Sequence, residues 1–135
     1  MELKTYQKNV LGDLTRFLTL MTENNSAAKA YKTLWEEKGV NVGFSGMAVY
    51  HYNLKNGVPD VCFKVPTGGG KTFIAANTIK TIYDAMPTAS TKAVVWLVPS
   101  DAILTQTYAA LSNPHHPYRQ KIDVDFGGAV EVYSR

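Results

Sequence analysis

The sequence has a single cysteine, Cys62, and no long apolar run. One cysteine excludes an intrachain disulfide, and no cysteine or histidine spacing matches a zinc site. No stretch approaches the roughly 18 apolar residues of a membrane-spanning helix. The N-terminal segment MELKTYQKNV also lacks the apolar core of a signal peptide. These absences favour a cytoplasmic protein.

A strong excess of one charge is missing as well. The 14 basic and 11 acidic residues leave a net charge of +3, which excludes a ribosomal or histone-like protein but is compatible with nucleic-acid binding. With 45% hydrophobic and 19% charged residues, the chain is typical of a folded globular protein. Its length of 135 residues indicates one domain or part of a larger one.

The first 60 residues predict two helices and an irregular segment. Apolar residues recur at spacings of three and four over 3–21, with Gln7 on the same dry face. A second helix is predicted over 26–38, capped by Ser26 and ended by Gly39. Residues 39–60 are rich in glycine and predict an irregular segment or a hairpin, with a turn at Asn56-Gly57.

The remainder alternates between strand and helix patterns. Strands are predicted over 61–65 and 93–98, and helices over 71–86 and 101–112. The tail predicts strand-like pieces over 122–126 and 130–132, around a turn at Gly127-Gly128. This order predicts an α/β fold with a βαβ unit in a parallel sheet. The sequence stops near the last of these pieces, as a fragment of a larger domain would.

The segment VPTGGGKT predicts a phosphate-binding loop between a strand and a helix. Glycines let backbone N–H groups converge on an anion, and the N-terminus of the following helix favours negative charge. Lys71 is then placed to contact the β- and γ-phosphates, and the Thr72 hydroxyl to bind Mg²⁺. The alternative is a flexible turn with a solvated Lys71. However, a lysine at a helix N-terminus opposes the helix dipole unless an anion lies nearby.

One position departs from the general phosphate-loop pattern, because Val65 stands where the first glycine is expected. With that substitution, VPTGGGKT resembles motif I of superfamily 2 helicases. LKTYQ over 3–7 resembles their Q motif, and WLVPSDAILTQ over 96–106 resembles motif Ia. Together the segments resemble the restriction (Res) subunit of type III restriction enzymes and the DEAD/DEAH-box proteins grouped with it.

This resemblance implies a RecA-like P-loop NTPase domain that binds ATP and Mg²⁺. Gln7 would hydrogen-bond the adenine edge and Tyr6 would pack near the base. The nucleotide-binding residues would be Tyr6, Gln7, Pro66, Thr67, Gly68, Gly69, Gly70, Lys71 and Thr72, with Lys71 and Thr72 serving catalysis. Pro99 and Ser100 match the position at which the family contacts the nucleic-acid backbone. Asp101 would repel phosphate there, so the contact would rest on Ser100 and backbone N–H groups. The alternative is that Ser100 and Asp101 only cap a helix.

The resemblance also implies the organisation of the protein. Residues 1–135 would be the N-terminal part of the first RecA-like helicase domain. It would comprise a helical lead-in with the Q motif (1–38), an irregular insert (39–60) and a P-loop βαβ core (61–135). The complete protein would be an ATP-dependent DNA translocase or helicase acting on duplex DNA. A nuclease would lie at its far C-terminus, and a methyltransferase subunit would supply sequence recognition.

Hydrolysis requires a second acidic motif that holds Mg²⁺ and orients the attacking water. The acidic residues after Lys71 are Asp84, Asp101, Asp123, Asp125 and Glu131. Asp125 is the only strand-like candidate and fits poorly, so the motif is expected beyond Arg135. The 135 residues alone are expected to bind nucleotide weakly and to turn over little or none. Two other functions remain open: a P-loop phosphotransferase or small ATPase without nucleic acid, and a non-catalytic nucleotide-binding module.

Three further patterns predict structural roles. Cys62 lies in a strand-like run and is expected in the core. Trp35 and Trp96 lie on apolar patterns and are expected in the core as well. The adjacent histidines of NPHHPY, over 113–118, are expected in an exposed loop rather than at a metal.

Overall fold

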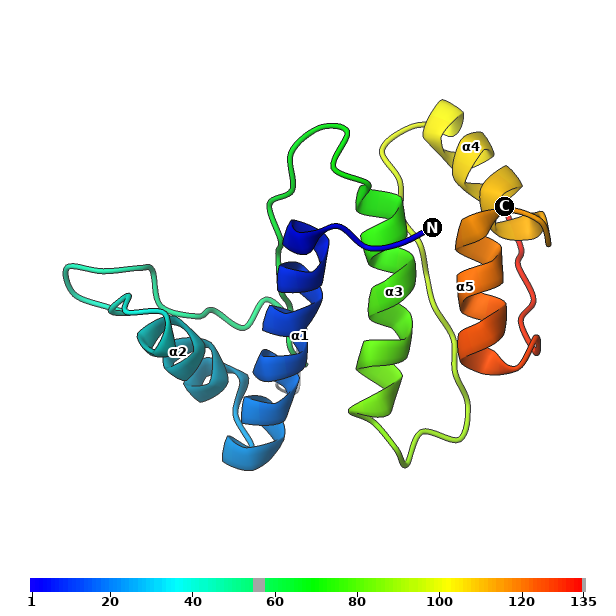
Figure 1. Cartoon of the computed structure of the whole chain (residues 1–135). Helices are drawn as coiled ribbons and strands as arrows, with labels where there is room; N and C mark the ends of the chain where they lie inside the picture. The colour runs from blue at the N-terminus through cyan, green and yellow to red at the C-terminus, as the bar shows by residue number, and fades with distance from the viewer. Residues whose placement is uncertain (55–57, 135) are drawn as a thin grey trace. The chain divides into compact units, whose positions relative to one another are not determined.

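The structure is a computed structural model that describes residues 1–54 and 58–134. In that part of the chain five helices form: α1 (Thr5–Asn24), α2 (Ala27–Glu37), α3 (Lys71–Asp84), α4 (Asp101–Ser112) and α5 (Pro117–Phe126) (Figure 1). They fall into two compact units. The helical-pair unit comprises Thr5–Val65, and the glycine-loop unit comprises Met1–Lys4 with Pro66–Arg135.

The helical-pair unit consists of α1, α2 and the segment that follows them. Its apolar contacts come from one face of α1 and the start of α2, as the sequence period requires. The buried apolar residues are Leu14, Phe17, Leu18, Leu20, Ala27 and Ala30. Arg16 on α1 also makes two hydrogen bonds to the Glu37 carboxylate at the end of α2, at 3.0 and 2.6 Å. The predicted helices are confirmed, although α1 begins and ends later than 3–21.

Local capping residues set the ends of α2. The Ser26 side chain accepts a hydrogen bond from the Lys29 amide, as an N-cap does. At the other end Gly39 has a φ of +76°, and its amide donates to the Glu36 carbonyl oxygen at 2.9 Å. The Val40 amide donates to Trp35 at 2.9 Å, which completes a Schellman motif. The predictions for Ser26 and Gly39 are therefore confirmed.

The segment after α2 is irregular, as predicted. Among the residues described there, the β-type pairing is one isolated bridge between Val42 and Met47. The predicted Asn56-Gly57 turn lies outside the described residues. Cys62, expected in the core, is exposed, and that prediction is wrong because no sheet covers its segment.

The glycine-loop unit packs α3 against α5. Phe73, at the start of α3, stacks on Tyr118, at the start of α5, with ring centroids 5.6 Å apart. Tyr83 and Phe126, at the other ends, meet edge to face at 6.1 Å. The two helices therefore run parallel, as Figure 1 shows. The most buried members of this core cluster are Ala76, Leu111 and Ile122, and Trp96 is partly buried against them.

The predicted α/β fold with a parallel sheet is wrong. The described residues contain helices and irregular segments, and apart from the bridge at Val42 they contain no strand pairing. A strand exists only if a neighbouring strand takes up its N–H and C=O groups. The runs 61–65 and 93–98, predicted as neighbouring strands, belong to different units. They form no strand pairing with each other.

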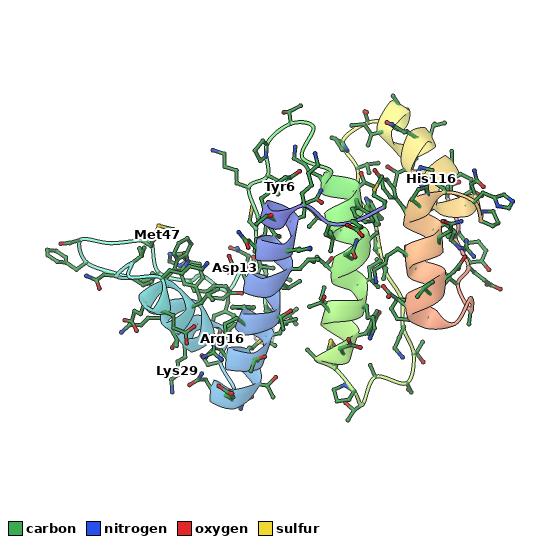
Figure 2. The ribbon with its side chains drawn as sticks, viewed as in Figure 1. Tyr6, Asp13, Arg16, Lys29, Met47 and His116 are labelled. Carbon is green, nitrogen blue, oxygen red and sulfur yellow. The ribbon has the colours of Figure 1, made fainter. Side chains whose placement is uncertain are left out.

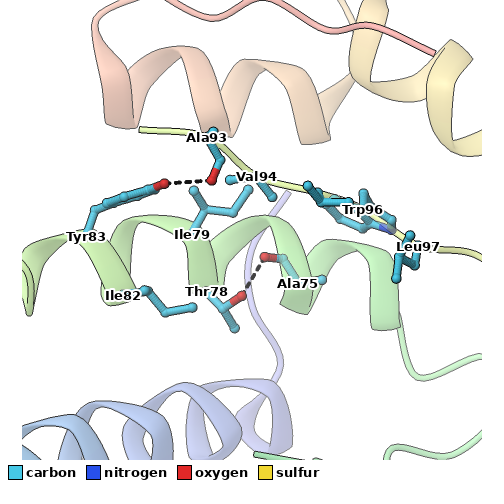
Figure 3. A pocket seen from close by; sticks show the side chains of 10 residues that line it. Ala75, Thr78, Ile79, Ile82, Tyr83, Ala93, Val94, Trp96 and Leu97 are labelled. Carbon is cyan, nitrogen blue, oxygen red and sulfur yellow. Dashed lines mark hydrogen bonds between the residues drawn. The ribbon is translucent and has the colours of Figure 1, made fainter. Parts of the chain in front are cut away.

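The run 93–98 packs along α3 instead (Figure 3). The Tyr83 hydroxyl donates a hydrogen bond to the Ala93 carbonyl oxygen at 2.9 Å. A groove of about 450 Å³ lies between α3 and this run, lined by side chains such as Ile79 and Trp96. Val95 and Leu97 also line this groove and remain 83% and 87% exposed. Within the run only Trp96 and Val98 are half-buried, whereas a central strand is covered on both faces.

The tail also differs from its prediction, because residues 122–126 belong to α5 rather than to a strand. Pro117 occupies the first turn of α5, where its fixed φ suits a helix, and Gly127 ends it with a φ of 63°. Two ion pairs at i,i+4 spacing, Arg119 with Asp123 and Lys121 with Asp125, add support. These local signals outweigh the alternation of three apolar residues.

Among the helices that the structure describes, none is long and apolar enough to cross a membrane.

Candidate functional site

The glycine loop forms a tight turn that leads directly into α3. The Gly69 amide donates a hydrogen bond to the Pro66 carbonyl oxygen at 3.0 Å. Gly68 and Gly70 have φ values of 74° and 70°, in the left-handed region that residues with a side chain seldom adopt. Around Gly68 an added Cβ would meet no atom within 4 Å. The requirement for glycine at Gly68 therefore comes from the backbone angle and not from crowding.

The N-terminus of α3 has no side-chain cap. Its N-cap is Gly70, whose carbonyl oxygen accepts the first hydrogen bond of the helix, from Ile74, at 3.0 Å. By contrast, α2, α4 and α5 are capped by the side chains of Ser26, Ser100 and His116. The first backbone N–H groups of an uncapped helix have no partner within the helix. They point outward at the positive end of the helix dipole. Here they face the region bounded by the glycine loop, and the first turn contains no acidic residue.

Lys71, the first residue of α3, folds back over the loop. Its Nζ donates a hydrogen bond to the Pro66 carbonyl oxygen at 3.2 Å, while the side chain stays exposed. Thr72 follows in the same turn and is half-buried. Residues 66–72 thus unite a helix N-terminus that has no side-chain cap with one cation. This combination can bind an anion such as a phosphate group.

Tyr118 holds the start of α3 in place and was missed by the sequence analysis. Its ring stacks on Phe73, two residues after Lys71, and its amide donates to the His116 imidazole Nδ1 at 3.2 Å. The expectation of an exposed histidine loop is therefore only partly right, since His116 caps α5 and is half-buried. Pro117 was the overlooked signal, because proline favours the first position of a helix.

Tyr6 and Gln7 lie in the first turn of α1. Gln7 is buried, as its place on the apolar face predicts, and Tyr6 is partly exposed. Both belong to the helical-pair unit, whereas residues 66–72 belong to the glycine-loop unit. Their joint contact with one nucleotide stays a prediction.

Pro99 and Ser100 lie immediately before α4, in the same unit as the glycine loop. The Ser100 side chain accepts a hydrogen bond from the Ile103 amide at 3.4 Å, and Asp101 is the first residue of α4. The serine therefore acts as an N-cap. A hydroxyl in that role keeps its proton for donation to a second acceptor.

Asp125, considered as a second acidic motif, lies at the wrong end of the unit for that role. It is in the last turn of α5 beside Phe126, which contacts Tyr83 near the C-terminus of α3. The glycine loop lies at the opposite end of α3, a 14-residue helix that spans about 20 Å. The Asp125 carboxylate bonds Lys121 instead. Within the described ranges no three His, Cys, Asp or Glu side chains cluster as metal ligands.

Comparison with known families adds a further observation. The family model described as type III restriction enzyme, res subunit, matches residues 1–132, nearly the whole chain. The chain belongs to the res subunit family of type III restriction enzymes. This agrees with the resemblance of the sequence, and the family is one of ATP-dependent, helicase-like subunits. Searches of curated proteins and of solved structures found no match.

Proposed function

We propose that this res-family chain is the ATP-binding part of an ATP-dependent DNA translocase or helicase, the restriction subunit of a type III restriction enzyme. The observation that carries the proposal is the uncapped N-terminus of α3, with Lys71 folded over a loop in which Gly68 and Gly70 have positive φ. Family membership over residues 1–132 supports ATP as the ligand.

The residues of the loop suit a phosphate chain. Backbone amides of the loop and of the first turn of α3 donate to phosphate oxygens, and Gly68 and Gly70 allow a close approach. Lys71 exchanges its present acceptor, the neutral Pro66 carbonyl oxygen, for a charged phosphate oxygen, which is the stronger partner.

The chain supplies few ligands for Mg²⁺. Thr72 offers one hydroxyl in the first turn of α3, and no acidic cluster lies among the residues described. Such a site suits Mg²⁺ that arrives with the nucleotide, held by phosphate oxygens, waters and Thr72. When bound, the ion neutralises charge on the phosphates.

The remaining contacts extend the proposal to the base and to DNA. Gln7 reads the adenine edge, since one amide both donates and accepts hydrogen bonds, and Tyr6 packs nearby. Pro99 and Ser100 contact the DNA backbone through the N-terminus of α4. A methyltransferase subunit supplies sequence recognition, as the family description of a restriction subunit suggests.

The test measures ATP binding by the chain and phosphate release by the full-length protein, with and without duplex DNA, beside a Lys71→Ala variant. Loss of the cation should weaken ATP binding at least tenfold, because a charge-assisted contact to phosphate disappears. Lys29→Ala is the matched control, since Lys29 is an exposed lysine on α2 (Figure 2).

Release of phosphate that rises with DNA and depends on Lys71 supports a nucleic-acid motor. Lys71-dependent binding and turnover that are indifferent to DNA and RNA would instead indicate a phosphotransferase or small ATPase. Equal ATP binding by wild type and Lys71→Ala would remove the phosphate loop itself from the proposal.

A further inference from the structure

The N-cap of α5 is a histidine, which accepts its hydrogen bond with a ring nitrogen (His116 is labelled in Figure 2). The His116 Nδ1 accepts from the Tyr118 amide at 3.2 Å. The backbone of His116 is fixed on both sides, because its amide donates to the Asn113 carbonyl oxygen and its carbonyl oxygen accepts from the Gln120 amide, at 2.9 and 3.0 Å. The cap is therefore held in a defined place at the start of the helix.

This cap exists only while the His116 ring is neutral. A backbone N–H can only donate, so Nδ1 must carry a lone pair, and the proton of the neutral ring is then on Nε2. A second proton, on Nδ1, turns the acceptor into a donor and removes the bond. It also places a positive charge at the N-terminus of α5, where the helix dipole opposes it. Histidine is the side chain type that ordinarily takes up such a proton between about pH 5 and 8.

Two aromatic rings connect the cap to the glycine loop. The His116 ring meets the Tyr118 ring edge to face, with centroids 4.5 Å apart. The Tyr118 ring in turn stacks on Phe73 at 5.6 Å, with an angle of 24° between the ring planes. Phe73 is buried and follows Lys71 and Thr72 in the first turn of α3. A displacement of Tyr118 therefore acts on the turn that presents the lysine and the threonine to a phosphate.

The charges on the neighbouring elements do not preserve the cap once His116 is protonated. The titratable groups at this end of the unit are His115 in the same loop, Tyr118 and Arg119 at the start of α5, and Lys71 at the start of α3. None of these groups is a carboxylate. The next acid along α5, Asp123, is bonded to Arg119 at 2.7 Å. Asp101 of α4 and Asp84 of α3 lie at the far ends of their helices.

We propose that His116 is a positioning residue for the nucleotide site and makes phosphate binding at residues 66–72 weaken as the pH falls. The inference rests on the proposed function, because it concerns the regulation of the same loop. While His116 is neutral, it caps α5, and Tyr118 supports Phe73 and the first turn of α3. Protonation releases the cap, loosens that support and lets the first turn of α3 fray. Serine, the cap of α2 and α4, provides no such coupling because it does not titrate in this range.

The test compares the ATP affinity of the wild-type chain with that of His116→Asn at about pH 7.5 and about pH 5.5. Asparagine is a good N-cap whose oxygen does not titrate in this range, so the variant keeps the cap without the proton. The two proteins should bind ATP equally at the higher pH. At the lower pH His116→Asn should bind about two- to fivefold more tightly, up to the factor that one N-cap supplies. Protonation of ATP itself affects both proteins and cancels in the ratio.

Two further variants check the residue and the route. His115→Asn is the matched control, since His115 is the exposed neighbour of His116, and it should follow the wild-type pH profile. Tyr118→Leu keeps apolar surface at a half-buried position but has no ring to stack on Phe73. In that background His116→Asn should no longer raise the ATP affinity at the lower pH, because the connection between the cap and α3 is cut.

A second measurement needs no nucleotide. The Ile74 amide makes the first hydrogen bond of α3, to the Gly70 carbonyl oxygen at 3.0 Å, so its hydrogen exchange, followed by NMR, reports fraying of that turn. At about pH 5.5 the amide should exchange about two- to fivefold faster in wild type than in His116→Asn, and at about pH 7.5 equally fast. The ratio of the two proteins at each pH removes the intrinsic pH dependence of exchange.

The inference and the proposed function fail in different ways. If ATP binding depends on Lys71 but wild type and His116→Asn match in affinity and exchange at the lower pH, only the role of His116 is overturned. A His115→Asn variant that loses the pH dependence, or a Tyr118→Leu background that keeps it, would also overturn that role. If exchange at Ile74 differs as expected but wild type binds no ATP, the coupling to α3 stands and the proposed function falls.

Discussion

Lys71 Nζ lies 3.2 Å from the carbonyl oxygen of Pro66, five residues earlier, and donates a hydrogen bond to it. The contact joins the two ends of the glycine loop, beside the first turn of α3. The cation is thus kept beside the loop by a neutral acceptor that a phosphate can displace. The nucleotide proposal and its Lys71→Ala test follow from this relationship.

Gly68→Ala should destabilise the protein by about 1 kcal/mol, because alanine is strained at a φ of 74° while no atom crowds the new methyl group. Urea unfolding measures the change. Gly12→Ala is the matched control, since Gly12 is within α1 with open space around it and alanine should stabilise a helix interior. Equal shifts for both variants would contradict the left-handed conformation of Gly68.

Gln7→Ala should reduce the preference for ATP over GTP about tenfold, because the amide that distinguishes the two base edges is removed. The measurement is the ratio of the two binding constants, which is independent of any loss of folded protein. Gln106→Ala, at an exposed glutamine of α4, should leave the ratio unchanged. An unchanged ratio in Gln7→Ala would exclude Gln7 as the reader of adenine.

Ser100→Ala should weaken DNA binding severalfold and also cost α4 about 1 kcal/mol as a lost N-cap. Ser26→Ala separates the two effects, since Ser26 caps α2 in the same way. It should lower stability by a similar amount without a change in DNA affinity. If both variants bind DNA like wild type, Ser100 is a cap and nothing more.

Arg119→Ala should lower the free energy of unfolding by on the order of 2 kcal/mol. The guanidinium bonds the Asp123 carboxylate, the Leu111 carbonyl oxygen and the Val130 carbonyl oxygen, at 2.7, 3.1 and 2.9 Å. It thereby joins α4, α5 and the tail. Arg119→Lys should recover only part of the loss, because an ammonium group cannot reproduce the planar fork. Full recovery by lysine would show that charge alone matters.

The Arg16–Glu37 contact should make the stability of the helical pair depend on acid. The hydrogen bond from Arg16 holds the pKa of Glu37 below its ordinary value. Because this pKa is lowered on folding, the contribution is present above the unfolded pKa, about 4, and is lost as the pH falls through the folded one. The free energies of unfolding of wild type and Glu37→Gln should differ at neutral pH and converge at acidic pH. A difference that grows on acidification would contradict the pairing.

The sequence by itself determined the features that depend on neighbouring residues. Ser26 and Gly39 mark the two ends of α2, and Ser100 caps the start of α4. The three glycines before Lys71 form a turn in which Gly68 and Gly70 have positive φ values. Family membership was equally accessible, because motif order is a property of the chain and not of its packing. Caps and turns are satisfied within a few residues, so local sequence is enough to specify them.

Only the tertiary structure decided what the apolar runs become. The run 93–98 has the composition of a buried strand, yet it packs along α3 with Val95 and Leu97 exposed, and no strand pairs with it among the residues described. Residues 122–126 alternate like a strand and are helical. Phe44, in a segment with no strong pattern, is the most exposed large apolar side chain described. A strand requires a distant partner for its hydrogen bonds, and burial requires a distant surface. The local sequence specifies neither the partner strand nor the covering surface.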